Sequence, residues 1–171
     1  MKRIILVFGL LSGTIVSLVM AISMITISKN PSLATGSGSM IVGYLSMIIA
    51  FALIFVAVKN YRDQHNNGLI SFGKAFKIGF FIALIASTMY VVVWAIVYHF
   101  FIPDFMDLYA AQMMKQAEGG SAIEMEQKAD EMMQYKEMYK NPLFFTLMTY
   151  AEILPVGLLV SLITGFILKR K

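Results

Sequence analysis

Four long runs of apolar residues constrain this chain more than any other feature of its sequence. They cover residues 4–28, 40–58, 78–102 and 143–168, and only the last contains a charged residue, Glu152. About 20 apolar residues in a helix cross the hydrocarbon core of a bilayer, where every backbone polar group must be hydrogen-bonded within the chain. The sequence therefore predicts an all-α fold, a polytopic membrane protein whose four-transmembrane-helix bundle forms a single integral membrane domain over residues 1–171.

The composition supports the same interpretation. Apolar types make up 58 % of the residues and charged types 14 %, against roughly 45–50 % and about 25 % in soluble domains. A soluble domain of this size has too much surface for its volume to bury so many apolar side chains. A soluble enzyme, a disordered chain and a nucleic-acid-binding module are therefore excluded, and the lipid bilayer is the expected surroundings.

The positions of lysine and arginine predict the orientation of the bundle. When four spans are threaded, nine of the fourteen basic residues fall on one side, where Asp63 is the sole acid. They are Lys2, Arg3, Lys59, Arg62, Lys74, Lys77, Lys169, Arg170 and Lys171. Because cytoplasmic loops are enriched in these residues, both termini are expected in the cytoplasm. The sequence pI of about 9.3 then reflects topology, and no nucleic-acid partner is expected.

The N-terminal run also resembles a secretory signal peptide, since it follows Lys2 and Arg3. Its apolar stretch exceeds the 7–15 residues of such a peptide, and no clear A-x-A cleavage site follows. We interpret it as an uncleaved first span.

Small residues recur at intervals of four in the first, third and fourth spans. The glycines in these stripes are Gly9, Gly13, Gly79, Gly157 and Gly165. Lipid tails are as apolar as leucine side chains, so membrane helices associate where small residues let their backbones approach. We expect these stripes to pack the four helices against one another, with homo-oligomerisation through the first span as the alternative.

Residues 103–141 form the one sizeable polar segment, and seven of the fourteen methionines lie in it. Gly119-Gly120 divides the segment, and Ser121 with Glu124 forms the S-x-x-E pattern of a capping box, which starts a helix. Pro142 is expected to end that helix. We predict an extracytoplasmic amphipathic helical hairpin between spans 3 and 4, whose candidate interaction surface is Met106, Met113, Met125, Met132, Met133 and Tyr139.

Three interpretations of this hairpin remain open. It folds back onto the membrane or the bundle, it binds a partner's helix or a hydrophobic ligand through its flexible methionines, or it captures Cu(I) through thioether sulfurs. No Met-x-Met array or neighbouring histidine supports the third interpretation.

Glu152 lies about ten residues inside the fourth span, where an ionised carboxylate costs at least a few kcal/mol. Pro155 follows three residues later, and because it has no N–H it frees the carbonyl of Ala151 and favours a kink. Both residues are candidates for an intramembrane functional site, since an acid beside a broken helix is a common way to build ion or proton sites. The alternative is a structural, protonated carboxyl that is hydrogen-bonded inside the bundle, to Thr149, Tyr44 or Tyr90. At 100° per residue Glu152 lies nearly opposite the Gly157 stripe.

No pattern of residues indicates catalysis or a cofactor. The chain has no cysteine, and its two histidines, His65 and His99, fall on opposite sides of the membrane, so no metal site is expected. Phosphate-binding glycine loops and the H-E-x-x-H and G-x-S-x-G motifs are also missing. We predict that the protein is not an enzyme.

One segment carries a family resemblance. It reads Tyr61-Arg62-Asp63, then Phe72-Gly73-Lys74 within the run GLISFGKAF. Together with the four-span frame and the acidic outer hairpin, it resembles the bacterial membrane family called domain of unknown function 4199. The resemblance implies a four-helix protein of a bacterial inner membrane and no activity. In physical terms the segment anchors the chain at the headgroups or forms a cytoplasmic docking surface.

The sequence thus predicts a non-enzymatic inner-membrane protein that interacts with a membrane or envelope protein through its Met-rich hairpin. The alternative is a proton-linked small transporter or channel component that uses Glu152.

Overall fold

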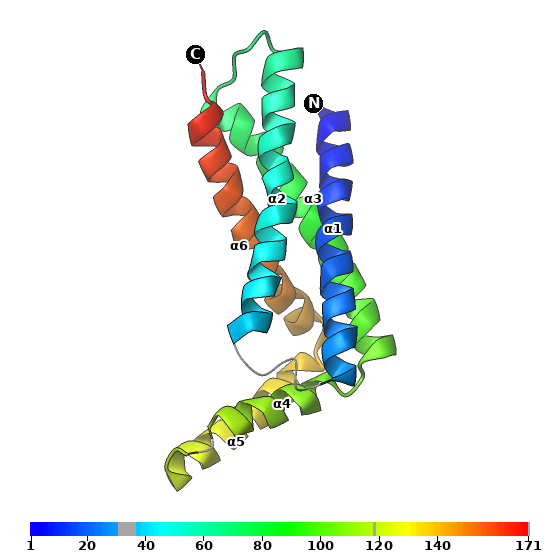
Figure 1. Ribbon diagram of the computed structural model, residues 1–171, viewed down its shortest axis with the longest axis vertical. Helices are drawn as coiled ribbons and strands as arrows, with labels where there is room; N and C mark the ends of the chain where they lie inside the picture. Colours follow the sequence, from blue (N-terminus) through cyan, green and yellow to red (C-terminus); the bar gives the residue numbers. More distant parts are fainter. Residues whose placement is uncertain (31–36, 118, 171) are drawn as a thin grey trace.

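A computed structural model describes residues 1–30, 37–117 and 119–170 of the chain. Six α-helices and one π-helical turn lie in this part, and no strand is present there. In order they are α1 (Lys2–Lys29), α2 (Ser37–His65), α3 (Phe72–Ile96), the π-helical turn η2 (Val97–Phe101), α4 (Phe105–Gln116), α5 (Ala122–Tyr139) and α6 (Pro142–Leu168). Figure 1 shows α1, α2, α3 and α6 as a long bundle, with α4 and α5 as a separate hairpin at one end.

Four helices of the described chain are long and apolar enough to cross a membrane. They cover Lys2–Lys29, Ile41–His65, Phe72–Phe101 and Pro142–Leu168, so the four predicted spans are confirmed as helices of that length and composition. The third helix starts six residues before the predicted Ile78, because Lys74 and Lys77 lie inside its first turns. Ser71 caps it by accepting a hydrogen bond from the backbone N–H of Lys74, a role for which serine is favoured.

The predicted role of Pro142 needs correction. Helix α5 ends at Tyr139, and Pro142 is the first residue of α6. The side chain of Asn141 caps α6 by accepting hydrogen bonds from the N–H groups of Leu143 and Phe144. Proline fits the first helical position because the N–H it lacks would have no partner there.

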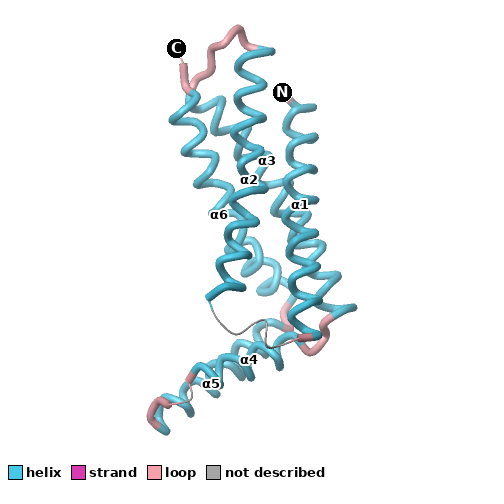
Figure 2. The backbone as a smooth tube through the Cα atoms, viewed as in Figure 1, coloured by secondary structure: helices cyan, strands magenta, loops and turns pink. Residues whose placement is uncertain are grey.

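Both chain ends lie at the same end of the bundle, and the hairpin lies at the other (Figure 1). Ile70, in the α2–α3 loop, forms an isolated antiparallel bridge with Arg170 through two backbone hydrogen bonds of 3.0 and 2.9 Å. This bridge connects the chain just after α6 to the loop between α2 and α3. Helix α3 runs obliquely behind α2 and α1, and the tube in Figure 2 shows the loop that joins α2 to α3 at the end of the bundle that holds the chain termini. Pro31 and Gly36 predict a loop between the first two spans, and residues 31–36 lie outside the described residues.

Small residues bring the helices into contact, and the contacts are within the chain. Gly9 and Gly13 of α1 lie against Ile85 and Met89 of α3. The other three glycines join α6 to α3 and α2: Gly79 lies against Ser161 and Ile54, Gly157 against Ala83 and Phe51, and Gly165 against Phe72. The glycine faces of the first, third and fourth spans are therefore occupied inside the bundle.

Candidate functional site

The second helix of the hairpin, α5, starts with a complete set of helix-capping contacts. Ser121 accepts from the N–H of Glu124, and the Glu124 carboxylate accepts from the N–H of Ser121 at 2.7 Å. The predicted capping box is confirmed. These hydrogen bonds stabilise the ionised carboxyl and hold the pKa of Glu124 below its usual value. Gly119, in the turn between α4 and α5, takes a backbone φ of +107°, a region that favours glycine.

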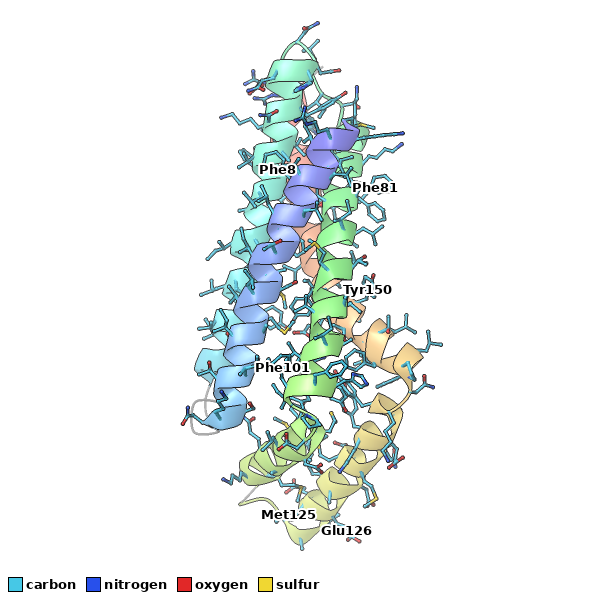
Figure 3. The ribbon with its side chains drawn as sticks, turned by 90° about the vertical axis from the view of Figure 1, so that its right-hand side faces the viewer. Phe8, Phe81, Phe101, Met125, Glu126 and Tyr150 are labelled. Atoms are coloured by element: carbon cyan, nitrogen blue, oxygen red, sulfur yellow. The ribbon has the colours of Figure 1, made fainter. Side chains whose placement is uncertain are left out.

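The predicted methionine surface does not form one exposed face. Met106 is buried at 4 % exposure, where α4 meets the bundle. Met113, Met125, Met132 and Tyr139 are half-buried, whereas Met133 is 66 % exposed. Figure 3 shows Met125 and Glu126 at the end of the hairpin farthest from the bundle. Of the six residues predicted to form the interaction surface, five are therefore buried or half-buried, and Met133 alone is exposed.

The outer face of α5 is acidic and still carries large apolar side chains. No residue of this 18-residue helix is buried. Ile123, Met133 and Met138 are exposed beside acids on this face. Lys128 and Lys140 pair with Glu131 and Glu137 at 2.9 and 2.6 Å, while Glu126 and Asp130 form no ion pair among the described residues.

An aromatic cluster joins the hairpin to the bundle. We call it the aromatic junction, and it consists of Trp94, Tyr98, Phe105, Tyr139 and Phe145, from α3, η2, α4, α5 and α6. Trp94 and Phe105 meet edge to face with ring centroids 4.9 Å apart, and Tyr139 meets Phe145 in the same way at 5.2 Å. Burial raises the pKa of Tyr139 to about 12.

Trp94 and Phe145 lie near the ends of their spans, where aromatic rings are expected to form a belt at the membrane surface. Both are buried, at 6 % and 5 % exposure. A second contact supports the junction, since Lys136 of α5 donates a hydrogen bond to Asp107 of α4, and this bond raises the pKa of Lys136. The hairpin is thus fixed to the bundle at its base and free along its outer face.

Glu152 lies on the outside of α6, while Gly157 faces inward against α3 and α2. None of the hydrogen bonds among the described residues involves Glu152, and Thr149 donates to the carbonyl of Phe145 instead. An exposed side chain on a spanning helix faces lipid or another protein, so this acid is directed away from the core of its own bundle.

Pro155 lies within α6, also on the outer side. Figure 3 shows the first turns of α6, around Tyr150, leaning away from the bundle axis. The Tyr150 hydroxyl is 2.8 Å from the Thr88 hydroxyl of α3, a polar contact between these two spans.

The family-like segment gathers at the end of the bundle that holds the chain termini. Arg62 pairs with Asp63 at 2.6 Å, and the ammonium of Lys74 lies 5.1 Å from the ring centre of Tyr61. The Phe72 ring packs on Phe166 with centroids 4.7 Å apart, and Gly73 is exposed with open space beside it. Burial of Tyr61 and Arg62, at 8 % and 7 % exposure, makes this segment part of the packed structure.

These features agree with the comparison to known proteins. The sequence model of the family DUF4199, described as a protein of unknown function, matches residues 7–170, nearly the whole chain. The chain belongs to this family. Neither the search of curated proteins nor that of solved structures found a match to this chain. The DUF4199 assignment confirms the resemblance carried by residues 61–79 and assigns no activity. Over the described residues, no group of three His, Asp or Glu side chains is placed to hold a metal ion.

Proposed function

We propose that this protein is a non-enzymatic integral protein of a bacterial inner membrane, whose four spans hold a hairpin that binds a partner protein outside the cytoplasm. In this proposal both termini are cytoplasmic, as the lysine and arginine distribution favours. The observation that carries it is the surface of α5, an ordered helix without a buried residue that exposes Ile123, Met133 and Met138 among acids.

The chemistry of this face indicates the kind of partner. In proteins most helical stability comes from packing an apolar face, and α5 leaves three large apolar side chains unpacked. The acids Glu126 and Asp130, which lack an ion pair among the described residues, supply negative charge beside them. A basic amphipathic segment of a membrane or envelope protein complements both properties, with lysine or arginine opposite the acids and apolar side chains opposite Ile123 and Met133.

Purification in a mild detergent with mass spectrometry tests this proposal. The triple variant Ile123→Ser, Met133→Ser, Met138→Ser is expected to lose the partner, because it removes the exposed apolar contacts. The matched control is the triple leucine variant at the same positions, which keeps apolar area and is expected to retain the partner. Retention of the partner by the serine variant would contradict the proposal, and so would its loss from both variants.

Glu152 supports a second candidate, a proton-linked transporter or channel component. It is the one charged residue within the apolar run of the fourth span, and Pro155, which interrupts the helical hydrogen bonding, follows three residues later. Flux into liposomes should then be abolished by Glu152→Gln and preserved by Glu126→Gln, a matched substitution on the hairpin surface. Absence of flux in the wild-type protein, or equal flux in both variants, rejects this candidate.

A further inference from the structure

A pocket of about 260 Å³ lies at the hairpin end of the bundle, between the last turns of α1 and one face of α4. Most of its lining is apolar. The residues that the argument uses are Met24 and Ser28 of α1, and Phe105, Leu108, Ala111 and Lys115 of α4. It is separate from the outer face of α5.

The pocket lies where the first and third spans end, which is the depth expected for the boundary between the hydrocarbon core and the headgroups. Ser28 is the penultimate residue of α1, and Lys29, the first charged residue after Arg3, follows it. Ile102, which also lines the pocket, directly follows the π-helical turn that ends the third span. Apolar cavities at this depth are within reach of lipid acyl chains and of headgroups at the same time.

The exposed lysines at the rim of the pocket favour an anionic amphiphile as its ligand. Lys115 is exposed and lines the pocket one helical turn from Ala111. It forms no ion pair in the described part of the chain, and Lys29 adds a second exposed cation beside the lining residue Ser28. Asp107, on the same helix, is already paired with Lys136.

We propose that this pocket binds one acyl chain of an anionic phospholipid from the leaflet on the hairpin side, with the lipid phosphate at the ammonium of Lys115. The size fits part of a chain: a dry cavity of about 150 Å³ holds benzene, and pockets for drug-sized molecules start at about 300 Å³. An acyl chain that moves from the bilayer into the pocket gains little from hydrophobic transfer, because lipid tails are as apolar as the lining, so the headgroup sets the preference, and the lysine is expected to favour an anionic headgroup about fivefold.

The single tryptophan of the chain provides the probe. Trp94 is buried, and its ring centroid is 4.9 Å from that of Phe105, whose side chain lines the pocket. A brominated acyl chain in the pocket should therefore quench Trp94 fluorescence. The protein in nanodiscs is titrated with brominated phosphatidylglycerol, brominated phosphatidylcholine or a brominated free fatty acid. We expect saturable quenching with phosphatidylglycerol at a mole fraction about fivefold lower than with phosphatidylcholine.

Two variants and their controls make the result specific. Ala111→Phe fills the pocket and should abolish the saturable quenching, whereas Ala122→Phe, on an exposed residue that does not line it, should leave it unchanged. Lys115→Gln should remove the preference for phosphatidylglycerol, and Lys140→Gln on the same hairpin should not. Circular dichroism establishes that each variant keeps its helices.

Three results would overturn the proposal. The first is quenching that rises in proportion to the brominated lipid and is unchanged by Ala111→Phe, since this is contact with bulk lipid. The second is equal binding of phosphatidylglycerol and phosphatidylcholine. The third is tighter binding of the free fatty acid than of phosphatidylglycerol, which would assign the pocket to a single-chain ligand.

Discussion

The contact between α3 and α6 at Gly157 offers a sharp test of how this bundle is held together. A Cβ at position 157 would lie 2.6 Å from the Cβ of Ala83 and 3.0 Å from the ring of Phe51. The Ala83 methyl is fixed to its backbone and cannot rotate away, so the two helices must separate. Gly157→Ala is therefore expected to destabilise the bundle.

The size of the effect follows from two opposing terms. Overpacking a close contact costs about 1–3 kcal/mol, while alanine in place of glycine stabilises a helix interior by about 0.8–1.0 kcal/mol. Gly43 of α2 is the matched control, because a Cβ there meets nothing within 4 Å. Gly43→Ala therefore gains the helix stabilisation from alanine without the cost of overpacking. The two variants should differ in free energy of unfolding by about 1–3 kcal/mol, with Gly157→Ala the less stable.

Unfolding in mixed detergent micelles, followed by the fluorescence of Trp94, measures this difference. The double variant Gly157→Ala, Ala83→Gly removes the methyl group that the new Cβ meets, and should recover a large part of the loss. If Gly157→Ala is as stable as Gly43→Ala, or if the double variant recovers nothing, α3 and α6 do not meet at this glycine and the packing argument fails.

Three further predictions concern the hairpin and the orientation. Ser121→Ala removes the cap of α5 and costs about 1 kcal/mol, so hydrogen exchange in the first turn of α5 should accelerate about fivefold; unchanged exchange would show that the capping box does not stabilise the helix. Burial raises the pKa of Tyr139 to about 12 from an unfolded value of about 10, so its contribution to stability is complete below pH 10 and is lost as the pH rises to about 12; thermal unfolding should show this loss, and Tyr139→Phe should reduce it, while Tyr135, whose pKa burial also raises, keeps its own share. Because the chain contains no cysteine, single cysteines test topology: one at Ser121 should react with an impermeant label in intact cells and one at Asn67 should not, and the reverse pattern would invert the orientation.

Sequence reasoning recovered the parts of this fold that depend on local composition. Charge-free runs located the four spans, and the S-x-x-E pattern located the start of α5. The sequence placed Glu152 nearly opposite the Gly157 stripe and left its surroundings open, and the structure shows it exposed on the outer side of α6. The third predicted span begins at Ile78 because it was defined by the charge-free run, whereas the helix itself starts at Phe72; Lys74 and Lys77 lie inside it because long basic side chains reach the headgroups from within a helix.

The features that the sequence did not predict depend on contacts between segments far apart in the chain. Trp94, Phe105 and Tyr139 come from three different helices, and no sequence period connects them. Met106 carries the same local signal as Met133, yet one is buried against the bundle and the other is exposed. The difference arises from the angle at which α4 leaves the third span, which the residues between Ile102 and Phe105 set.

The length of the third helix has a mechanical consequence. Its 30 residues, Phe72–Phe101, would extend about 45 Å, against a hydrocarbon thickness of about 30 Å. Hydrophobic mismatch of this kind is relieved by tilting, and α3 is the oblique helix of the bundle (Figure 1). A thinner bilayer is expected to increase that tilt. Because the aromatic junction joins α5 to α3, the angle of the hairpin relative to the membrane is expected to change with bilayer thickness.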